Sequence, residues 1–238
     1  MGKKYVAVSG GADSTALALL LWERGEDFEL CFADTGAEFI ESYWILSRLA
    51  NTVRKPLNVV SNGTFYQHLV NFNYFIPGPM ARWCTGELKR KPQERFYKTM
   101  EAERVYVGIR ADEPNRIDNQ KHFNVINDYP LATMGYGKRE VKEICKKYDL
   151  LNPIYEWRTN VSCFCCFFQR KKDWRGLLLY YPSLYRLAEE WEDQAINTSK
   201  QPFGWNQNFT LKKFRETKEE NSQLWPDPEC EPCLICSL

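Results

Sequence analysis

The stretch KYVAVSGGADSTALALLL, residues 4–21, changes from an apolar strand pattern to an apolar helix pattern through two adjacent glycines. A simple turn needs one glycine at most, so Gly10 and Gly11 indicate that a ligand approaches the backbone closely. Backbone N–H groups in a turn that precedes a helix N-terminus form a site for anions. The sequence therefore predicts a phosphate-binding loop, and a serine- or aspartate-capped strand–helix turn is the simpler alternative.

The other side chains of the loop suit an anionic ligand. Ser9 and Ser14 offer hydroxyl donors, and Asp13 can cap the helix or help to hold Mg²⁺. No Gly-Lys-Ser/Thr follows the glycines, and the segment lacks the Gly-x-Gly-x-x-Gly pattern. The loop is therefore neither a Walker loop nor the dinucleotide-binding fingerprint, and we expect its ligand to bind across Ser9, Gly10, Gly11, Asp13, Ser14 and Thr15.

Strand and helix patterns alternate through the first half of the chain. In order they are a strand at 5–9, a helix over 14–24, a strand at 28–34, a helix over 38–51 and a strand at 57–61. After a helical stretch over 87–103 comes a further strand at 104–110. This alternation predicts an α/β fold with a parallel sheet and helices on both faces. Ligands of such sheets bind beyond the carboxyl ends of the strands, where this sequence carries SGGADS, ADTGAE and GIRADE.

The chain changes character after Asn152-Pro153, first to a cluster of cysteines and aromatic residues and then to helix patterns over about 173–191 and 210–222. We therefore predict a nucleotide-binding domain over residues 1–155. Residues 156–238 are predicted to form a cysteine-rich helical region that completes the active site.

The composition limits the classes of function. Lys plus Arg number 32 and Asp plus Glu 31, which leaves a net charge of +1, so any nucleic-acid site must be a local patch. No stretch approaches the roughly 18 apolar residues of a membrane span, and the first residues lack a secretion signal. We expect a cytoplasmic protein with no membrane partner, and the sequence leaves the oligomeric state open, a homodimer included.

Four segments carry a resemblance to a known family. Residues 9–14 match every fixed position of Ser-Gly-Gly-x-Asp-Ser, the PP-loop of the ATP pyrophosphatases. Residues 33–38, 83–92 and 108–116 resemble successive motifs of the phosphoadenosine phosphosulfate reductase-like branch of that superfamily. That branch includes sulfonucleotide reductases and a sulfurtransferase subunit of DNA phosphorothioation. The resemblance covers roughly residues 4–169 and implies an adenine nucleotide alpha hydrolase-like fold that binds ATP with Mg²⁺.

The resemblance also implies roles for individual residues. Asp34 would lie near the nucleoside, while Arg110 and Lys89 would face phosphate or the activated substrate. Together with Asp13 of the loop, Lys89 and Arg110 are our candidate catalytic residues, and Arg110 also belongs to the nucleotide-binding set.

The nine cysteines favour metal or redox chemistry over a disulfide framework. Cys84 and the pair Cys163 and Cys166 are spaced to grip one metal or cluster, with aromatic residues around them. Three thiolates suit an iron–sulfur cluster better than structural zinc, which needs four ligands. Burial as small apolar residues is the alternative for all three, and it is what we expect of Cys31 and Cys145.

Iron–sulfur adenylylsulfate reductases resemble this layout but have a cysteine pair where this chain has Trp83 and Cys84. The resemblance implies a 4Fe-4S cluster held by Cys84, Cys163 and Cys166. Its fourth position is open or is met by Cys165 or by a cysteine of the C-terminal tail, for which Cys230, Cys233 and Cys236 are candidates; we assign Cys233. The tail alternatively holds a separate metal, acts as a mobile thiol or has no function.

Basic residues gather near the predicted site. Six lie between 82 and 98, and four more lie between 170 and 175. If Cys84 and Cys166 meet, these groups form a rim that tracks a phosphate backbone, with Trp83, Phe167 or Trp174 available to stack on a base. Solvated helix faces are the alternative.

The function we predict is adenylation of an acceptor by ATP with release of pyrophosphate, followed by sulfur transfer to a nucleic acid or nucleotide. The sulfur, carried on the cluster or on a tail cysteine, would come from a cysteine desulfurase or from sulfide. One alternative is a sulfonucleotide reductase that releases sulfite, although the Glu-Cys-Gly-based tail motif of those enzymes is absent. Another is a non-catalytic module that binds nucleotide or nucleic acid.

Overall fold

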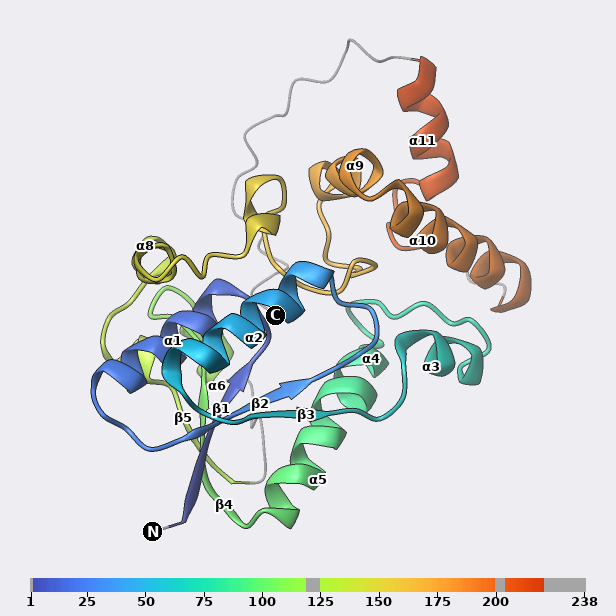
Figure 1. The fold of residues 1–238 in the computed structure, drawn as a ribbon. Helices are drawn as coiled ribbons and strands as arrows, with labels where there is room; N and C mark the ends of the chain where they lie inside the picture. Colours follow the sequence, from blue (N-terminus) through green and yellow to red (C-terminus); the bar gives the residue numbers. More distant parts are fainter. Residues whose placement is uncertain (1, 119–124, 200–203, 221–238) are drawn as a thin grey trace.

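The fold, known from a computed structural model, is described over residues 2–118, 125–199 and 204–220 (Figure 1). A five-stranded sheet lies at its centre, and every strand pairing is parallel. The strands are β1 (Lys3–Val8), β2 (Glu29–Ala33), β3 (Leu57–Val60), β4 (Ala102–Val107) and β5 (Ile126–Asp128), in the spatial order β3-β2-β1-β4-β5. Strands β2 and β3 therefore lie on one side of β1, and β4 and β5 lie on the other, so the strand order reverses at β1. Ligands of such sheets bind beyond the carboxyl end of the strand where the order reverses.

Helices connect the strands and continue beyond them. Those of the first half are α1 (Ala12–Glu23), α2 (Ile40–Val53), α3 (Phe65–Asn71), α4 (Trp83–Thr85), the π-helix η1 (Gly86–Arg90), α5 (Lys91–Thr99) and α6 (Asn115–Asp118). The others are α7 (Pro130–Thr133), α8 (Lys138–Lys147), the 3₁₀-helix η2 (Pro153–Glu156), α9 (Lys171–Tyr180), α10 (Pro182–Gln194), the π-helix η3 (Ala195–Ser199) and α11 (Leu211–Glu220). The predicted α/β fold with a parallel sheet is confirmed.

The side chains of β1 alternate between the two faces of the sheet, as the pleat requires. Val6 and Val8 enter a hydrophobic core with α1, α2 and α8 on one face. Tyr5 points to the opposite face and packs on Tyr97 of α5, with ring centroids 5.6 Å apart. Helices therefore cover both faces, as the sequence predicted.

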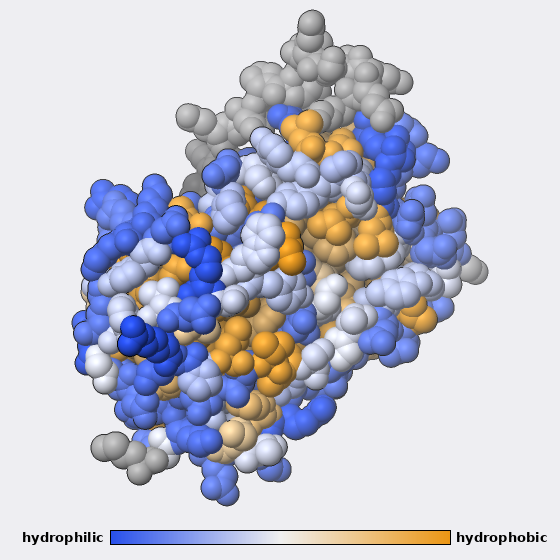
Figure 2. Space-filling model, in the orientation of Figure 1, coloured by the Kyte–Doolittle hydropathy of each residue, from blue (hydrophilic) through white to orange (hydrophobic). Residues whose placement is uncertain are grey.

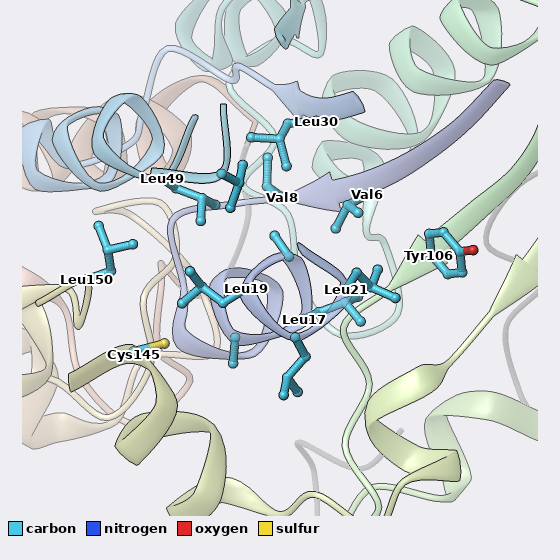
Figure 3. Close-up of a cluster of buried hydrophobic side chains, with 14 of the residues drawn as sticks. Val6, Val8, Leu17, Leu19, Leu21, Leu30, Leu49, Tyr106, Cys145 and Leu150 are labelled. Atoms are coloured by element: carbon cyan, nitrogen blue, oxygen red, sulfur yellow. The ribbon is translucent and has the colours of Figure 1, made fainter. Parts of the chain in front are cut away.

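Helix α1 is buried along most of its length, because Ala12 and every residue from Ser14 to Leu21 are buried. A helix that is apolar all round can be stable only inside a core. Figure 3 shows Leu17, Leu19 and Leu21 pointing in different directions from α1. The phosphate loop precedes this helix directly, so the loop rests on a largely buried element.

A second hydrophobic cluster joins the C-terminal helices to segments of the first half. It contains Trp174, Tyr185 and Trp191 of α9 and α10 together with Phe39 and Phe65. Phe65 and Trp191 stack with ring centroids 5.6 Å apart. Figure 1 shows α9, α10 and α11 on the side of the molecule toward which the strands run. The division at residue 155 stays a prediction, and both parts supply this cluster.

The single helix predicted over 173–191 is in fact two helices, α9 and α10. Pro182 has no N–H and restricts the residue before it. Tyr181 accordingly leaves the helical region, with φ −136° and ψ 60°. The helix predicted over 210–222 corresponds to α11 as far as residue 220, and its last two residues lie outside the described part.

The surface carries several separate apolar patches, and Figure 2 shows some on the sheet-bearing part and some on the C-terminal helices. Trp44 of α2 and Tyr180 of α9 are among the large hydrophobic side chains that are more than half exposed. Among the described residues, none of the helices has both the length and the apolar character needed to cross a membrane.

Candidate active site

The loop between β1 and α1 has a shape that requires glycine. Gly10 has a φ of +74°, in the left-handed region that side chains disfavour. A Cβ atom at Gly10 would lie 3.0 Å from the backbone of Ser42 in α2. Gly11 is extended and forms the N-cap of α1 without any side-chain cap. The capped-turn alternative therefore does not describe Gly11.

Hydroxyl groups hold the loop closed. Ser9 N–H donates to Ser14 Oγ at 3.1 Å, and Ser14 Oγ donates to the carbonyl of Gly11 at 3.2 Å. The two hydroxyl oxygens of Ser9 and Ser14 are 3.3 Å apart. Two hydroxyls and the helix N-terminus thus lie together, which is the arrangement that binds a phosphate group.

Residues far along the chain support the loop from outside. Ala12 N–H donates to the hydroxyl of Tyr155 at 3.0 Å, and Asn152 Nδ2 donates to the Gly10 carbonyl at 3.1 Å. The thiol of Cys145 in α8 donates to the Ala12 carbonyl at 3.3 Å. The sequence did not indicate roles for Tyr155 and Asn152, because about 140 residues separate them from the loop and neither stands in a recognisable motif. Cys145 is fully buried in a helix, as predicted.

Arg110 joins the loop to the end of β4. Its guanidinium donates to Asp13 at 2.7 Å and to Asp112 at 2.8 Å, and it lies 3.2 Å from Glu113. Burial raises the pKa of the Asp13 carboxyl, and Arg110 opposes that rise. Gly108 allows this approach, because a Cβ there would lie 3.0 Å from the backbone N of Ser14. Two of the predicted catalytic residues, Asp13 and Arg110, are therefore in direct contact.

Asp34 stands at the end of β2, one strand away from the loop. Its Oδ1 accepts from the Tyr43 hydroxyl at 2.7 Å and from the Gly36 N–H at 2.9 Å. Burial, and after it the hydrogen bond to Asp34, raises the pKa of Tyr43. The carboxylate is thus fixed at the carboxyl edge of the sheet, and its contact with a nucleoside stays a prediction.

The segment after Asp34 leads to the cysteines. Glu38 Oε1 accepts from Thr35 Oγ1 at 2.9 Å and lies 3.5 Å from Cys163 Sγ. The N–H of Phe164 donates to the Ala37 carbonyl at 2.9 Å. Residues 161–166, which we call the thiol loop, are therefore attached to the segment that follows β2.

The thiol loop also reaches the phosphate loop. A Cβ at Gly11 would lie 3.9 Å from Cβ of Val161, two residues before Cys163. Glu38 was not among our predicted site residues, although its motif, ADTGAE, was recognised in the sequence.

Lys89 lies with the thiols and not with Arg110. The pKa of Lys89 is raised because Cys163, and after it Glu38, favours the charged ammonium, while burial opposes this. Burial raises the pKa of the Cys163 thiol to about 12 and raises that of Cys84 as well. A second cation, Arg158, is buried and donates to the Cys163 carbonyl at 2.9 Å. The candidate catalytic residues thus form two groups, one at the phosphate loop and one at the thiols.

The thiols satisfy the donor chemistry of an iron–sulfur cluster. Cys163 and Cys166 share one turn, in which the Cys166 N–H donates to the Cys163 carbonyl at 3.1 Å, and the nearby cations Lys89 and Arg158 suit anionic thiolate ligands. Over residues 2–118, 125–199 and 204–220, however, no three cysteine, histidine or acidic side chains are arranged to hold a metal ion as they stand. The side chains would have to turn toward a common point.

The fourth cluster ligand stays a prediction. Cys165 is fully buried, beside Cys163 and Cys166. The predicted ligand Cys233 and the other tail candidates, Cys230 and Cys236, lie outside the described residues. Cys31 is fully buried in β2, which confirms its predicted packing role.

The basic rim stays a prediction. Two of its members form ion pairs four residues apart on the helix, Arg90 with Glu94 at 3.2 Å and Lys91 with Glu87 at 2.5 Å. The prediction for Trp174 is wrong, because its fully buried side chain cannot stack on a base.

The other two predicted stacking residues, Trp83 and Phe167, are partly exposed. Trp83 stacks on Phe72 with centroids 5.0 Å apart, and Phe167 packs on Phe168 with centroids 4.2 Å apart. The guanidinium of Arg82 lies over the Phe168 ring, 5.3 Å from its centroid. These aromatic groups lie next to the cysteine segments in the sequence.

Comparison with known families gives a match that covers more than half of the chain. The family model described as phosphoadenosine phosphosulfate reductase domain matches residues 3–161. The matched segment includes the phosphate loop, Asp34, Lys89 and Arg110, and it ends just before Cys163.

Similar curated proteins are longer than this chain. An uncharacterized protein of Methanocaldococcus jannaschii is 24% identical over 221 residues, which cover 89% of this chain and 51% of that protein. The tRNA-specific 2-thiouridylase MnmA of Coxiella burnetii is 28% identical over 191 residues, which cover 67% of this chain and 52% of that enzyme. The chain therefore spans about half the length of these relatives.

Among solved structures, a phosphoadenylyl-sulfate reductase from Candida auris, in complex with phosphate, has a similar fold. The TM-score is 0.52 at 14% sequence identity, and the match covers 68% of this chain and 82% of that one. At this identity the likeness concerns the fold alone.

Proposed function

Because the chain belongs to the phosphoadenosine phosphosulfate reductase domain family, we propose that it is an ATP-dependent PP-loop enzyme that activates an acceptor for sulfur transfer. ATP binds across residues 9–15, with Asp34 toward the nucleoside and Arg110 beside the phosphates. The observation that carries the proposal is the closeness of the thiol loop to the phosphate loop, with Val161 against Gly11. A nucleotide and a sulfur-bearing group then react at one place.

The chemistry proceeds in two displacements. An acceptor oxygen forms a bond to the α-phosphorus of ATP, and the bond to pyrophosphate breaks. A donor at the oxidation level of sulfide then forms a carbon–sulfur bond to the acceptor, and AMP leaves with the former acceptor oxygen. A cysteine desulfurase with a thiol reductant, or free sulfide, supplies that sulfur. Lys89 stabilises negative charge that develops beside the thiols.

Nucleic acid is the acceptor class that we favour, and tRNA is the first probe. The support is the similarity to a tRNA-specific 2-thiouridylase and the partly exposed aromatic groups around Trp83 and Phe168. Stacking on aromatic rings is how proteins hold single-stranded bases.

We assign Mg²⁺ to the triphosphate itself. The carboxylates of Asp13, Asp112 and Glu113 are already paired with Arg110. Asp13 is the loop carboxylate that can approach a metal ion brought in by ATP. For a 4Fe-4S cluster, Cys84, Cys163 and Cys166 would be the protein ligands, and the bound cluster would supply a site for handling sulfur or electrons.

The proposal is tested by measuring pyrophosphate release from ATP with bulk tRNA and sulfide under anaerobic conditions, followed by analysis of the nucleosides for sulfur. We expect release that depends on tRNA, and a loss of at least about tenfold in Asp13→Asn. Asp27→Asn is the matched control, because Asp27 is exposed, pairs with Lys55 and is not assigned to the site. Its rate should equal that of the natural protein.

The competing outcomes are distinct. Release of sulfite from adenylyl sulfate, with no pyrophosphate from ATP, would replace the proposal by the reductase alternative. Binding of ATP without turnover, unchanged in Cys84→Ala, would indicate a non-catalytic module.

A further inference from the structure

A lysine of α8 lies beside the phosphate loop. Lys142 Nζ is 4.5 Å from the centroid of the Tyr155 ring, and the hydroxyl of the same tyrosine accepts from Ala12 N–H at 3.0 Å. Cys145, on the next turn of α8, donates to the Ala12 carbonyl. Helix α8 therefore contacts the first residue of α1 both directly and through Tyr155, and Lys142 is held close to that contact.

Over the parts of the chain that the structure describes, the ammonium of Lys142 forms no ion pair with a carboxylate, although its side chain is half-buried. The carboxylate of Asp13 in the phosphate loop is close enough to favour the charged form of Lys142. Lys147 of the same helix, by contrast, pairs with Glu23 at 2.7 Å. Burial lowers the pKa of Lys142, and the neighbouring cations Lys138 and Lys146 lower it further, while the Asp13 carboxylate opposes them. A partly buried cation that forms no ion pair is costly, so an arriving anion would gain the energy of that contact.

Space is available in front of Lys142. A cavity of about 710 Å³ lies between α2 and α8. Its lining includes Lys142, Tyr155 and Asn152, and the latter two bond the phosphate loop. The cavity therefore adjoins two residues that bond the loop, although none of residues 9–15 is among its lining.

The net negative charge of the side chains beside the phosphate loop also favours a further cation at the nucleotide site. Among the described residues, Arg110 is the one basic side chain that forms an ion pair with Asp13. Arg110 is shared with Asp112 and Glu113, and Arg116 pairs with Glu113, so three carboxylates face two guanidinium groups. A triphosphate would add negative charge to a group that is already negative overall.

We propose that Lys142 is a second phosphate-binding cation. Its ammonium moves away from the Tyr155 ring and contacts the β- or γ-phosphate of a nucleotide that is bound at residues 9–15. This inference rests on the proposed function, since it assigns a new residue to the same nucleotide site. Lys142 then distinguishes nucleotides with a polyphosphate chain from those with a single phosphate.

The test is equilibrium binding of ATP and of AMP to the natural protein, Lys142→Met and Lys146→Met, by calorimetry in the presence of Mg²⁺. Methionine keeps the apolar stem that packs on Tyr155. Lys146 is the matched control, because it lines the same cavity one turn further along α8, is exposed and is not assigned to the site. Thermal unfolding of each variant verifies that it is folded.

We expect Lys142→Met to weaken ATP binding by about tenfold to a hundredfold, the range for a lost charge-assisted hydrogen bond. AMP binding should change by less than about twofold, and Lys142→Arg should restore most of the affinity for ATP. Lys146→Met should bind both nucleotides normally. Equal binding of ATP by Lys142→Met and the natural protein, or equal losses for ATP and AMP, would overturn the inference and leave the proposed function standing. Absence of ATP binding by the natural protein would overturn both.

Discussion

Single residues decide whether the phosphate loop can form. Gly10 has a left-handed backbone conformation, and Ser42 occupies the space that a side chain at this position would need. Backbone conformation and lack of space therefore both exclude other residues here. Arg110 is similarly specific, because a guanidinium presents several donors in a fixed fork and reaches three carboxylates at once.

Gly10→Ala is expected to destabilise the protein by about 1–3 kcal/mol through backbone strain, and to abolish ATP binding because the loop moves off Ser42. The matched control is Gly25→Ala. Gly25 has a similar φ of +73° but nothing within 4 Å of an added Cβ. Chemical denaturation and ATP titration should therefore show a stability loss in both variants and a binding loss in Gly10→Ala alone. Normal ATP binding by Gly10→Ala would contradict this account of the loop.

At the scale of elements, buried polar groups join the C-terminal helices. Glu192 of α10 is fully buried, and its carboxylate accepts from the N–H groups of Trp205 and Leu211. Its Oε1 lies 1.8 Å from where a Cβ of Gly204 would be, so only glycine fits there. This carboxylate thus connects α10 to the start of α11.

Burial raises the pKa of Glu192 to about 7 from an ordinary value of 4.5. A carboxyl group with a raised pKa in the folded state contributes stability below pH 4.5, and that contribution is lost as the pH rises through 7. Between about pH 5 and about pH 8, the free energy of unfolding of the natural protein should fall by roughly 2–3 kcal/mol relative to that of Glu192→Gln, which cannot ionise. Thermal unfolding of both proteins across this range measures the difference. Parallel curves would mean that Glu192 does not titrate as described.

At the scale of the whole molecule, the two hydrophobic clusters connect different sets of elements. One lies between the sheet, α1, α2 and α8. The other takes Phe39, Phe65 and Leu69 from the first half and packs them against α9 and α10. The phosphate loop precedes α1, which belongs to the first cluster, whereas Ala37 and Phe164, which bond to each other after β2, belong to the second.

A fragment of residues 1–155 tests whether the predicted domain division is real. Without the C-terminal helices this fragment exposes Phe39, Phe65 and Leu69, so we expect it to aggregate or to lack a cooperative unfolding transition. Circular dichroism with thermal unfolding gives the answer. A cooperatively folded fragment that binds ATP would instead establish residues 1–155 as an independent domain.

Substitution of cysteines tests whether Cys84 and Cys163, which are far apart in the sequence, hold one iron–sulfur cluster. Anaerobically purified protein is expected to contain iron and sulfide and to absorb broadly in the visible range, and Cys84→Ser and Cys163→Ser should each lose both. Cys31→Ala is the control, because this buried cysteine belongs to β2. Iron-free natural protein would exclude the cluster, and retention of iron by Cys84→Ser would exclude Cys84 as a ligand.

Much of the fold was predictable because its signals are local. The alternation of strands and helices predicted the parallel sheet, and the Gly10-Gly11 pair predicted the loop. The break at Pro182 was also local, but the apolar pattern on both sides of it favoured one helix over two. Trp174 was misjudged because a sequence does not reveal which side of an aromatic helix faces the core.

By itself the sequence determined the family, the sheet and the residues of the phosphate loop, since a motif of adjacent residues specifies its own backbone geometry. Only the tertiary structure decided that Arg110 pairs with Asp13, that Lys89 lies among the thiols, and that Tyr155 and Lys142 border the loop. These contacts join residues that are dozens to more than a hundred positions apart. They depend on how helices pack over the sheet, which local patterns do not record.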